Sequence, residues 1–409
     1  MTPRERLFLE ITRAIAEDSL AGSSDISIVE GVVNRLVDGG VPLCRHQIGY
    51  DTLHPLAGGR VYTWRYGEGI ELDEIGRSAA ESSTSMWVHS PFHYLYTGGG
   101  SLLRVRLPPT EACHRFAILL ELAGKGVTDY LAGVERLGAA VQMGEFDCVY
   151  SSWAPRADGG FADEDVALLA AIGPFVAMAL VAGTTRQITR TLVSTYLGDD
   201  AGERVLRGAI TRGVAERIRA VVWFSDLKGF TRLVDTVDPE LVLPLLDEYA
   251  EPQVTAIHEH GGTVLKFIGD GVLAIFPVGA SQAEAGRRAL AAAEVAFAAL
   301  TEVSARRSAG GMPVTEAYLA LHLGEVFYGN IGGADRLDFT VIGPAVNEAA
   351  RMSAMCRPLD QDILLSQALV DAVPGLQDRL VALGSHRLRG VAQAQALYGV
   401  RGTMDGPVP

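Results

Sequence analysis

Cysteine is scarce in this chain. Only four cysteines occur among 409 residues, Cys44, Cys113, Cys148 and Cys356, and no two of them form a Cys-x-x-Cys pair. Such spacing excludes a dense disulfide framework and a cysteine-based zinc site. Reduced thiols are the simplest interpretation, so we predict a cytoplasmic protein.

Positive charge is also in short supply. Lys and Arg number 35 against 49 Asp and Glu, which leaves a formal net charge of −14. This balance excludes a general binder of nucleic acid or of anionic membranes, because both attract basic surfaces. An acidic protein that handles a polyphosphate must bring positive charge to one place, as bound metal ions or as placed Lys and Arg.

Long apolar runs are absent except at residues 166–183, VALLAAIGPFVAMALVAG. This run has the length of the shortest membrane spans. It contains Gly173 and Pro174, and three acidic residues precede it, which suits the first turn of a helix. We therefore predict a buried or dimer-forming helix and treat a membrane span as the less favoured alternative. The charged, helical N-terminus does not resemble a signal peptide.

The length predicts two or three domains. Residues 1–185 are predicted to form one α+β domain. It would open with a helix at Arg4–Ala16, continue with strand-like runs at 58–69, 101–109 and 115–124, and close with the apolar helix. This order resembles the GAF family of small-molecule sensor domains. The resemblance implies a regulatory domain whose small-molecule or protein regulator is unknown.

The second half has a different pattern. Residues 186–218 form an Arg-rich connector with helical character and too few apolar positions for a core. Residues 219–403 read as strand, helix, hairpin, helix and strand. That order predicts an α+β domain with a ferredoxin-like βαββαβ core.

Two carboxylates in this second half stand at strand and turn positions. Asp226 follows the apolar run VVWF, and Asp270 lies between two glycines in the hairpin FIGDGVLAIF. Either aspartate alone would be read as an ordinary turn residue. If the strands pair, the two carboxylates meet at one edge of a sheet, where they could hold two divalent cations.

Polar groups suited to a nucleotide surround these aspartates in sequence. The loop Gly229, Phe230 and Thr231 leads into a helix, where backbone N–H groups can hold phosphate oxygens. Asn347 and Arg351 are four residues apart and share one helix face. An amide beside a guanidinium suits a ribose and a charged phosphorane better than a core.

Three motifs make the pattern specific: FSDLKGFT, KFIGDGVLAIF and FTVIGPAVNEAARM. Together they resemble the catalytic domain of class III adenylyl and guanylyl cyclases. The resemblance implies that Asp226 and Asp270, with Leu227 beside them, bind two Mg²⁺ or Mn²⁺ ions. It also implies that Asn347 positions the ribose and that Arg351 stabilises the transition state.

The same resemblance bears on the nucleotide and on the assembly. Lys266 and Thr340 fall on the base-reading positions, and this pair is typical of enzymes that use ATP. Arg389 matches, more loosely, a residue that touches the phosphates. The family builds each site from two subunits, which implies a homodimer. A cyclase that prefers GTP or a pyrimidine nucleotide, or an inactive nucleotide-binding module, stays open as an alternative.

Overall fold

The computed structural model describes residues 1–52, 57–76, 87–98, 100–107, 115–143, 146–211, 213–333, 335–391 and 393–400. Cys113 and residues 401–403, the end of the predicted second domain, lie outside the described residues. The chain divides into two compact units, Met1–Thr191 and Leu192–Pro409.

A six-stranded antiparallel sheet forms the centre of the first unit. Its strand order is β3-β2-β1-β6-β5-β4. Because β1 and β6 are central, their side chains are largely buried. The strands are β1 (Leu43–Asp51), β2 (Ala57–Arg65), β3 (Gly69–Gly76), β4 (Leu102–Arg106), β5 (Asp129–Arg136) and β6 (Cys148–Pro155).

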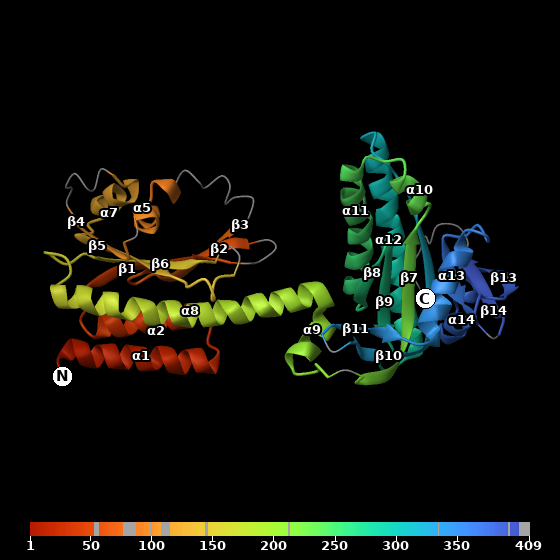
Figure 1. Cartoon of the computed structure of the whole chain (residues 1–409), viewed down its shortest axis with the longest axis horizontal. Coiled ribbons are helices and arrows are strands. Elements are labelled where there is room, and N and C mark those ends of the chain that lie inside the picture. Colours follow the sequence, from red (N-terminus) through yellow and green to blue (C-terminus); the bar gives the residue numbers. More distant parts are fainter. Residues whose placement is uncertain are drawn as a thin grey trace. The chain divides into compact units, whose positions relative to one another are not determined.

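Helices cover both faces of this sheet (Figure 1). Three of them lie along one face: α1 (Pro3–Ala21), α2 (Asp25–Asp38) and α8 (Asp163–Leu197). The start of α1 is defined locally, because Thr2 and Glu5 form a capping box and Pro3 occupies the first turn. The short helices α5 (Pro91–Gly98) and α7 (Ala117–Gly124) pack on the opposite face.

The strand-like run at residues 115–124 is a helix, so that prediction was wrong. Residues 117–124 form α7, with Leu119 and Leu122 buried against the sheet. The two leucines are three residues apart, a helical spacing. The run contains only one β-branched residue, Ile118, and its Ala and Leu content favours a helix once the sheet offers an apolar face.

Helix α8 carries the apolar run. Within the described residues it is the one helix long and apolar enough to span a membrane, with a mean hydropathy of 2.3 over its best window. Part of it is buried in the first unit, including Leu168, Leu169 and Ile172. A core helix of a globular domain meets the same criteria of length and hydropathy.

The second unit is built on a sheet of eight strands. The order is β13-β14-β12-β10-β7-β9-β8, and β11 pairs with β10. All pairs are antiparallel except β10 with β12. The strands are β7 (Ala215–Leu227), β8 (Thr263–Ile268), β9 (Gly271–Pro277), β10 (Ala317–Gly332), β11 (Leu337–Ile342), β12 (Ile363–Ser366), β13 (Leu380–His386) and β14 (Gln395–Val400).

The predicted α+β class is confirmed, and the βαββαβ order is present as β7, α11 (Pro239–Glu259), β8, β9, α12 (Gln282–Ala309) and β10. Its four strands lie in the order β10-β7-β9-β8. The remaining helices of this unit are α9 (Asp199–Leu206), α10 (Phe230–Val234), α13 (Pro344–Cys356) and α14 (Gln367–Ala372), with a 3₁₀ turn at Gln377–Arg379.

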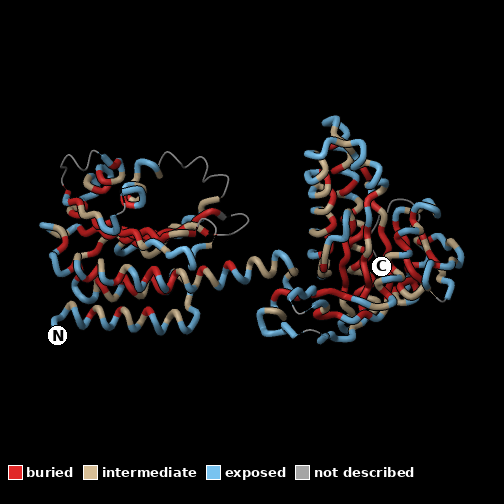
Figure 2. The backbone as a smooth tube through the Cα atoms, in the orientation of Figure 1, coloured by how far each residue is buried: buried red, intermediate tan, exposed pale blue. Residues whose placement is uncertain are grey.

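Strand β7 is the central element of this unit, and its alternating side chains fill two cores. Val221 and Trp223 pack with α11, α12 and α14 on one face of the sheet. Ala220 and Val222 pack with α9 and α13 on the other. Figure 2 shows the resulting run of buried backbone through the central strands. The connector predicted to be helical at residues 186–218 contains α9. Its last residues, 215–218, already belong to β7 and are strand rather than helix.

Candidate functional site

The two predicted aspartates come together at the end of β7. Strand β7 pairs with β9 in a register that sets Phe224 opposite Leu273, so the β8–β9 turn lies beside the residues that follow. The backbone N–H of Leu227 donates to Oδ2 of Asp270 at 3.1 Å. This bond ties the residue next to Asp226 to the carboxylate of the turn.

Glycine makes this approach possible. A Cβ added at Gly271 would lie 2.3 Å from the carbonyl oxygen of Ser225, so a side chain there would push the turn away from β7. Gly269, on the other side of Asp270, has a φ of +64°, in the left-handed region that glycine adopts freely. The Gly-Asp-Gly sequence is therefore a geometric requirement of the site.

The carboxylate of Asp270 perturbs Asp226. Partial burial raises the pKa of Asp226 to about 6, and hydrogen bonding and charge repulsion from Asp270 add to the effect. Two neighbouring carboxylates are a donor set suited to a hard divalent cation. Among the described residues no group of three or more His, Cys, Asp or Glu side chains is placed to bind a metal, so the aspartate pair would need backbone, solvent or substrate oxygens as further ligands.

The segment after Asp226 is held by Lys228. Its ammonium forms ion pairs with Glu316 and, at 2.6 Å, with Asp362, and it lies 5.0 Å from the ring of Tyr318. Its backbone N–H donates to the carbonyl of Glu316 at 2.7 Å. Sequence reasoning left Lys228 without a role. Its partners lie more than 80 residues away, and no local pattern points to them.

The loop after Lys228 leads into α10. Gly229 has a φ of +66° and is exposed, Phe230 packs with Leu227 against α11, and Thr231 is exposed. The predicted phosphate loop thus begins beside the aspartate pair.

Asn347 and Arg351 lie on the exposed face of α13. The opposite face of this helix, with Ala345, Ala349 and Met352, is buried on the sheet. The side chains of Asn347 and Arg351 form no hydrogen bond or ion pair with any described residue. An unpaired amide and an unpaired guanidinium on one face are free to bind something outside this chain.

Lys266 and Thr340 come from β8 and β11, two strands that do not pair with each other in the sheet. Thr340 pairs with Gly329 of β10, is only 5% exposed, and its hydroxyl oxygen has no hydrogen-bond partner in the described structure. Lys266 forms an ion pair with Asp338, which stands two residues before Thr340 on β11. Sequence reasoning missed Asp338. Its two-residue spacing from Thr340 places both on one face of the strand.

No hydrogen bond or ion pair joins Arg389 to the aspartates among the described residues. It lies in the exposed segment between β13 and β14, and no hydrogen bond or ion pair among the described residues involves its side chain. Its expected contact with phosphate stays a prediction.

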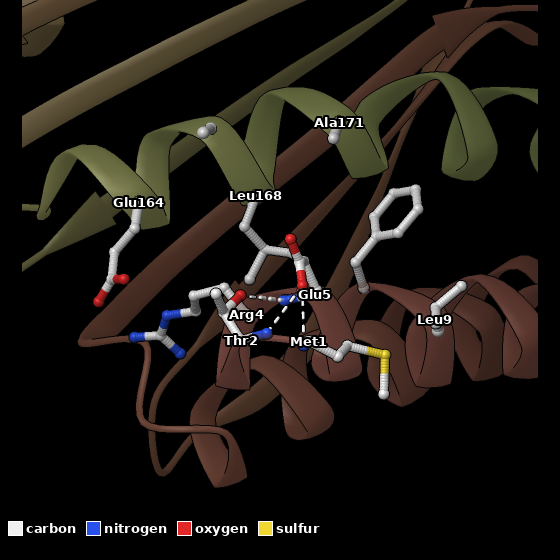
Figure 3. Close-up of a pocket in the computed structure, with 10 residues that line it drawn as sticks. Met1, Thr2, Arg4, Glu5, Leu9, Glu164, Leu168 and Ala171 are labelled. Carbon is white, nitrogen blue, oxygen red and sulfur yellow. Dashed lines mark hydrogen bonds and ion pairs between the residues drawn. The ribbon is translucent and has the colours of Figure 1, made fainter.

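Two cavities lie away from the predicted site residues. One of about 570 Å³ lies between the start of α1 and α8, where Figure 3 shows Leu168 and Ala171 above Leu9 and the Thr2–Glu5 cap. Another of about 540 Å³ lies between β10 and the start of α13. Neither is lined by a predicted site residue.

Comparison with known proteins identifies the second unit. Residues 214–402 match the family described as "Adenylate and Guanylate cyclase catalytic domain". Residues 214–402 form a cyclase catalytic domain. The class III resemblance of these residues is thereby confirmed, and the match covers somewhat less than half of the chain.

Relatives of the cyclase domain include an uncharacterised protein of Mycobacterium tuberculosis, 34% identical over 52% of this chain and 38% of that protein. An adenylate cyclase of Anabaena cylindrica is 29% identical over 46% of this chain and 38% of its own length. The chain thus matches less than two-fifths of either relative. The crystal structure of the adenylyl cyclase CyaB from P. aeruginosa is 23% identical over 47% of this chain and 98% of that one, with a TM-score of 0.42.

Proposed function

We propose that this protein is an adenylate cyclase that converts ATP to 3′,5′-cyclic AMP and pyrophosphate. The observation that carries the proposal is the hydrogen bond from the Leu227 N–H to Asp270, which joins the two aspartate-bearing segments inside a cyclase catalytic domain. Relatives named as adenylate cyclases support ATP as the substrate.

The aspartate pair would hold the metal ions. Asp226 and Asp270, with the carbonyl of Leu227 beside them, are the residues we assign to two Mg²⁺ or Mn²⁺ ions. When bound, such ions activate an attacking oxygen and neutralise a departing phosphate. The raised pKa of Asp226 beside Asp270 in the free protein fits this role, because bound cations would favour its charged form.

The remaining residues would bind and orient the nucleotide. The backbone from Gly229 to Thr231 begins next to the aspartates and would hold phosphate oxygens. Arg351 would neutralise charge on the phosphorane, and Asn347 would fix the ribose. A bond forms from the ribose 3′-oxygen to the α-phosphorus as the bond to pyrophosphate breaks, and the hydroxyl proton leaves to solvent.

Lys266 and Thr340 would read the base. Lys266 donates to ring-nitrogen acceptors such as those of adenine, whereas a carboxylate there would accept from the N–H groups of guanine. The unpaired hydroxyl of Thr340 is a buried polar group that lacks a partner, and a base edge would supply one. Asp338 holds the Lys266 ammonium in place until a nucleotide arrives.

The active site would be shared between two copies of the chain. The side chains of Asn347 and Arg351 are exposed and form no hydrogen bond or ion pair with the described residues, which leaves them available to a nucleotide held by a second copy. A two-fold homodimer completes two sites, because an isologous interface repeats each contact.

The first unit would be a GAF-like regulatory domain in a cytoplasmic protein. Its antiparallel sheet, covered by helices on both faces and followed by a helix with an acidic first turn, supports that assignment. The connector at residues 186–218, which begins within α8, would pass its state to the catalytic domain.

The test offers ATP, GTP, CTP and UTP separately to the full chain with Mn²⁺ or Mg²⁺ and identifies cyclic products by mass. We expect cyclic AMP from ATP, and a loss of at least about 100-fold in Asp270→Asn. Asp247→Asn, an exposed carboxylate on α11, is the matched control and should keep full activity. Product mainly from another nucleotide would refute the roles given to Lys266 and Thr340. Absence of any cyclic product from the dimeric chain would refute the proposed cyclase activity.

A further inference from the structure

A small polar cavity lies in the first unit, far along the chain from the cyclase residues. Its volume is about 100 Å³, and it is bounded by β1, the turn after β2, α7 and the end of β6. Four cationic side chains line it, against two carboxylates, Glu68 and Glu121. The cationic residues are Arg45, Arg65, Lys125 and Arg156. The lining therefore has an excess of two positive charges, in a protein whose net charge is −14.

Two of these cations already have partners. Lys125 forms an ion pair with Glu121 at 2.6 Å, and Arg65 forms one with Glu71 at 2.8 Å. Arg45 and Arg156 form no ion pair and no hydrogen bond with any described residue. The cationic groups of the cavity that lack an ion pair with a described residue are thus the guanidinium groups of Arg45 and Arg156.

The position of Arg45 makes the lack of an ion pair energetically costly. Arg45 is half-buried on β1, and the register of the sheet sets it directly opposite Arg65 of β2. Like charges directly opposite each other on neighbouring strands destabilise a sheet. Burial lowers the pKa of Arg45, and Arg65 lowers it further. A guanidinium kept unpaired under these conditions has no structural benefit that offsets its desolvation.

We propose that this cavity is a binding site for a small oxyanion with two negative charges, of the size of inorganic phosphate. The volume admits a group of a few heavy atoms and excludes a nucleoside. Guanidinium groups match the planar oxygen pairs of such anions through two parallel hydrogen bonds. Arg45 and Arg156 supply two guanidinium groups without an ion pair in the described part of the chain, and the Tyr66 hydroxyl, in the lining, is a further donor. The binding is independent of the reaction proposed for the second unit.

The test uses the full chain and inorganic phosphate. Titration calorimetry at constant ionic strength, with chloride as the competing salt, should show one saturable site per chain. Arg45→Met and Arg156→Met should each weaken binding at least tenfold. Arg13→Met removes an exposed arginine of α1 and should leave binding unchanged. Asp270→Asn should also leave it unchanged, because phosphate held at the cyclase site would respond to the loss of a metal ligand.

A second measurement locates the anion. The thiol of Cys44 lines the cavity and is half-buried, so bound phosphate should slow its alkylation, followed by peptide mass spectrometry. The buried Cys356 serves as the internal reference. Protection of Cys44 should be absent in Arg45→Met.

Thermal melting separates a ligand site from a structural role. In buffer without oxyanions, Arg45→Met should melt at the temperature of the unaltered protein or above it, because the variant lacks an unpaired half-buried charge. Phosphate should raise the melting temperature of the unaltered protein and not that of the variant. A lower melting temperature of Arg45→Met without phosphate, absence of phosphate binding, or binding that survives both arginine variants would each overturn the proposal.

Discussion

The two units of this chain use polar side chains in opposite ways. The first unit buries them in closed networks. Asp129 is fully buried, accepts from Arg104 at 2.8 Å and from the N–H of Phe161 at 3.1 Å, while His46 donates to the carbonyl of Ser152. The second unit leaves predicted site residues at strand ends and on an exposed helix face, where Asn347 and Arg351 have no side-chain partner among the described residues.

This difference separates polar groups that maintain a fold from those available for chemistry. A buried network whose members are all paired stabilises one arrangement and leaves nothing to bind a substrate. An unpaired group can bind a ligand at little cost. By the same criterion the half-buried Arg45 of the first unit, which lines a cavity and forms no ion pair with the described residues, suggests a binding site. Four changes sharpen or break this contrast, taken from the largest expected effect to the smallest.

The largest effect is expected at Asp129. Asp129→Ala leaves the Arg104 guanidinium and the Phe161 N–H without their acceptor, and breaking a buried pair costs about 3–5 kcal/mol. Tryptophan fluorescence during urea unfolding should report this loss, since three of the four tryptophans, Trp64, Trp87 and Trp153, lie in the first unit. A loss below about 1 kcal/mol would show that the network does not maintain the fold.

His46 should make the first unit sensitive to acid. Burial lowers its pKa from 6.5 to about 3, so below pH 6.5 the unfolded chain binds a proton that the folded chain does not. The contribution of His46 to stability is thus complete above pH 6.5. It falls by about 1.4 kcal/mol per pH unit as the pH drops toward 3.

His46→Gln should flatten that slope, measured by urea unfolding between pH 4 and pH 7 through the fluorescence of Trp153, which stacks on His46. His322, in the second unit, has a pKa lowered by burial to about 4 and serves as the control, because its own contribution should persist in the variant. An unchanged slope in the first unit would assign its acid sensitivity to other groups.

Lys228 should matter for catalysis more than for folding. Lys228→Met removes the ion pairs to Glu316 and Asp362 that hold the segment after Asp226. A displaced loop should lower kcat by about 10- to 100-fold, with a smaller change in KM. Lys228→Arg can restore both ion pairs and should recover most of the activity. Equal activity of the Met and Arg variants would mean that Lys228 does not position the loop.

The smallest effect on stability is expected at Thr340. Its buried hydroxyl has no partner, so the isosteric Thr340→Val should change the free energy of unfolding by less than about 1 kcal/mol or raise it. Its effect should appear in KM for ATP, and the same change should leave KM for other nucleotides less affected. A large loss of stability would place Thr340 among the structural polar groups of the first unit.

Much of the fold followed from local patterns. The βαββαβ order was predictable because short continuous apolar runs mark β7 and β9 and apolar residues recur at helical spacing in α11 and α12, and these patterns depend only on neighbours in the chain. The strand prediction for residues 115–124 was wrong because Ala and Leu fit either structure when read alone. The apolar face of the sheet decided it.

The sequence by itself determined which residue types occur in which order, including the aspartates, the asparagine and the arginine of the three cyclase motifs. Only the tertiary structure decided that Leu227 donates to Asp270 across 43 residues, that Lys228 is held by Glu316 and Asp362, and that Arg45 faces Arg65. The physical reason is register. Contacts between distant segments depend on how strands align, and a shift of one residue would turn each of these side chains to the other face.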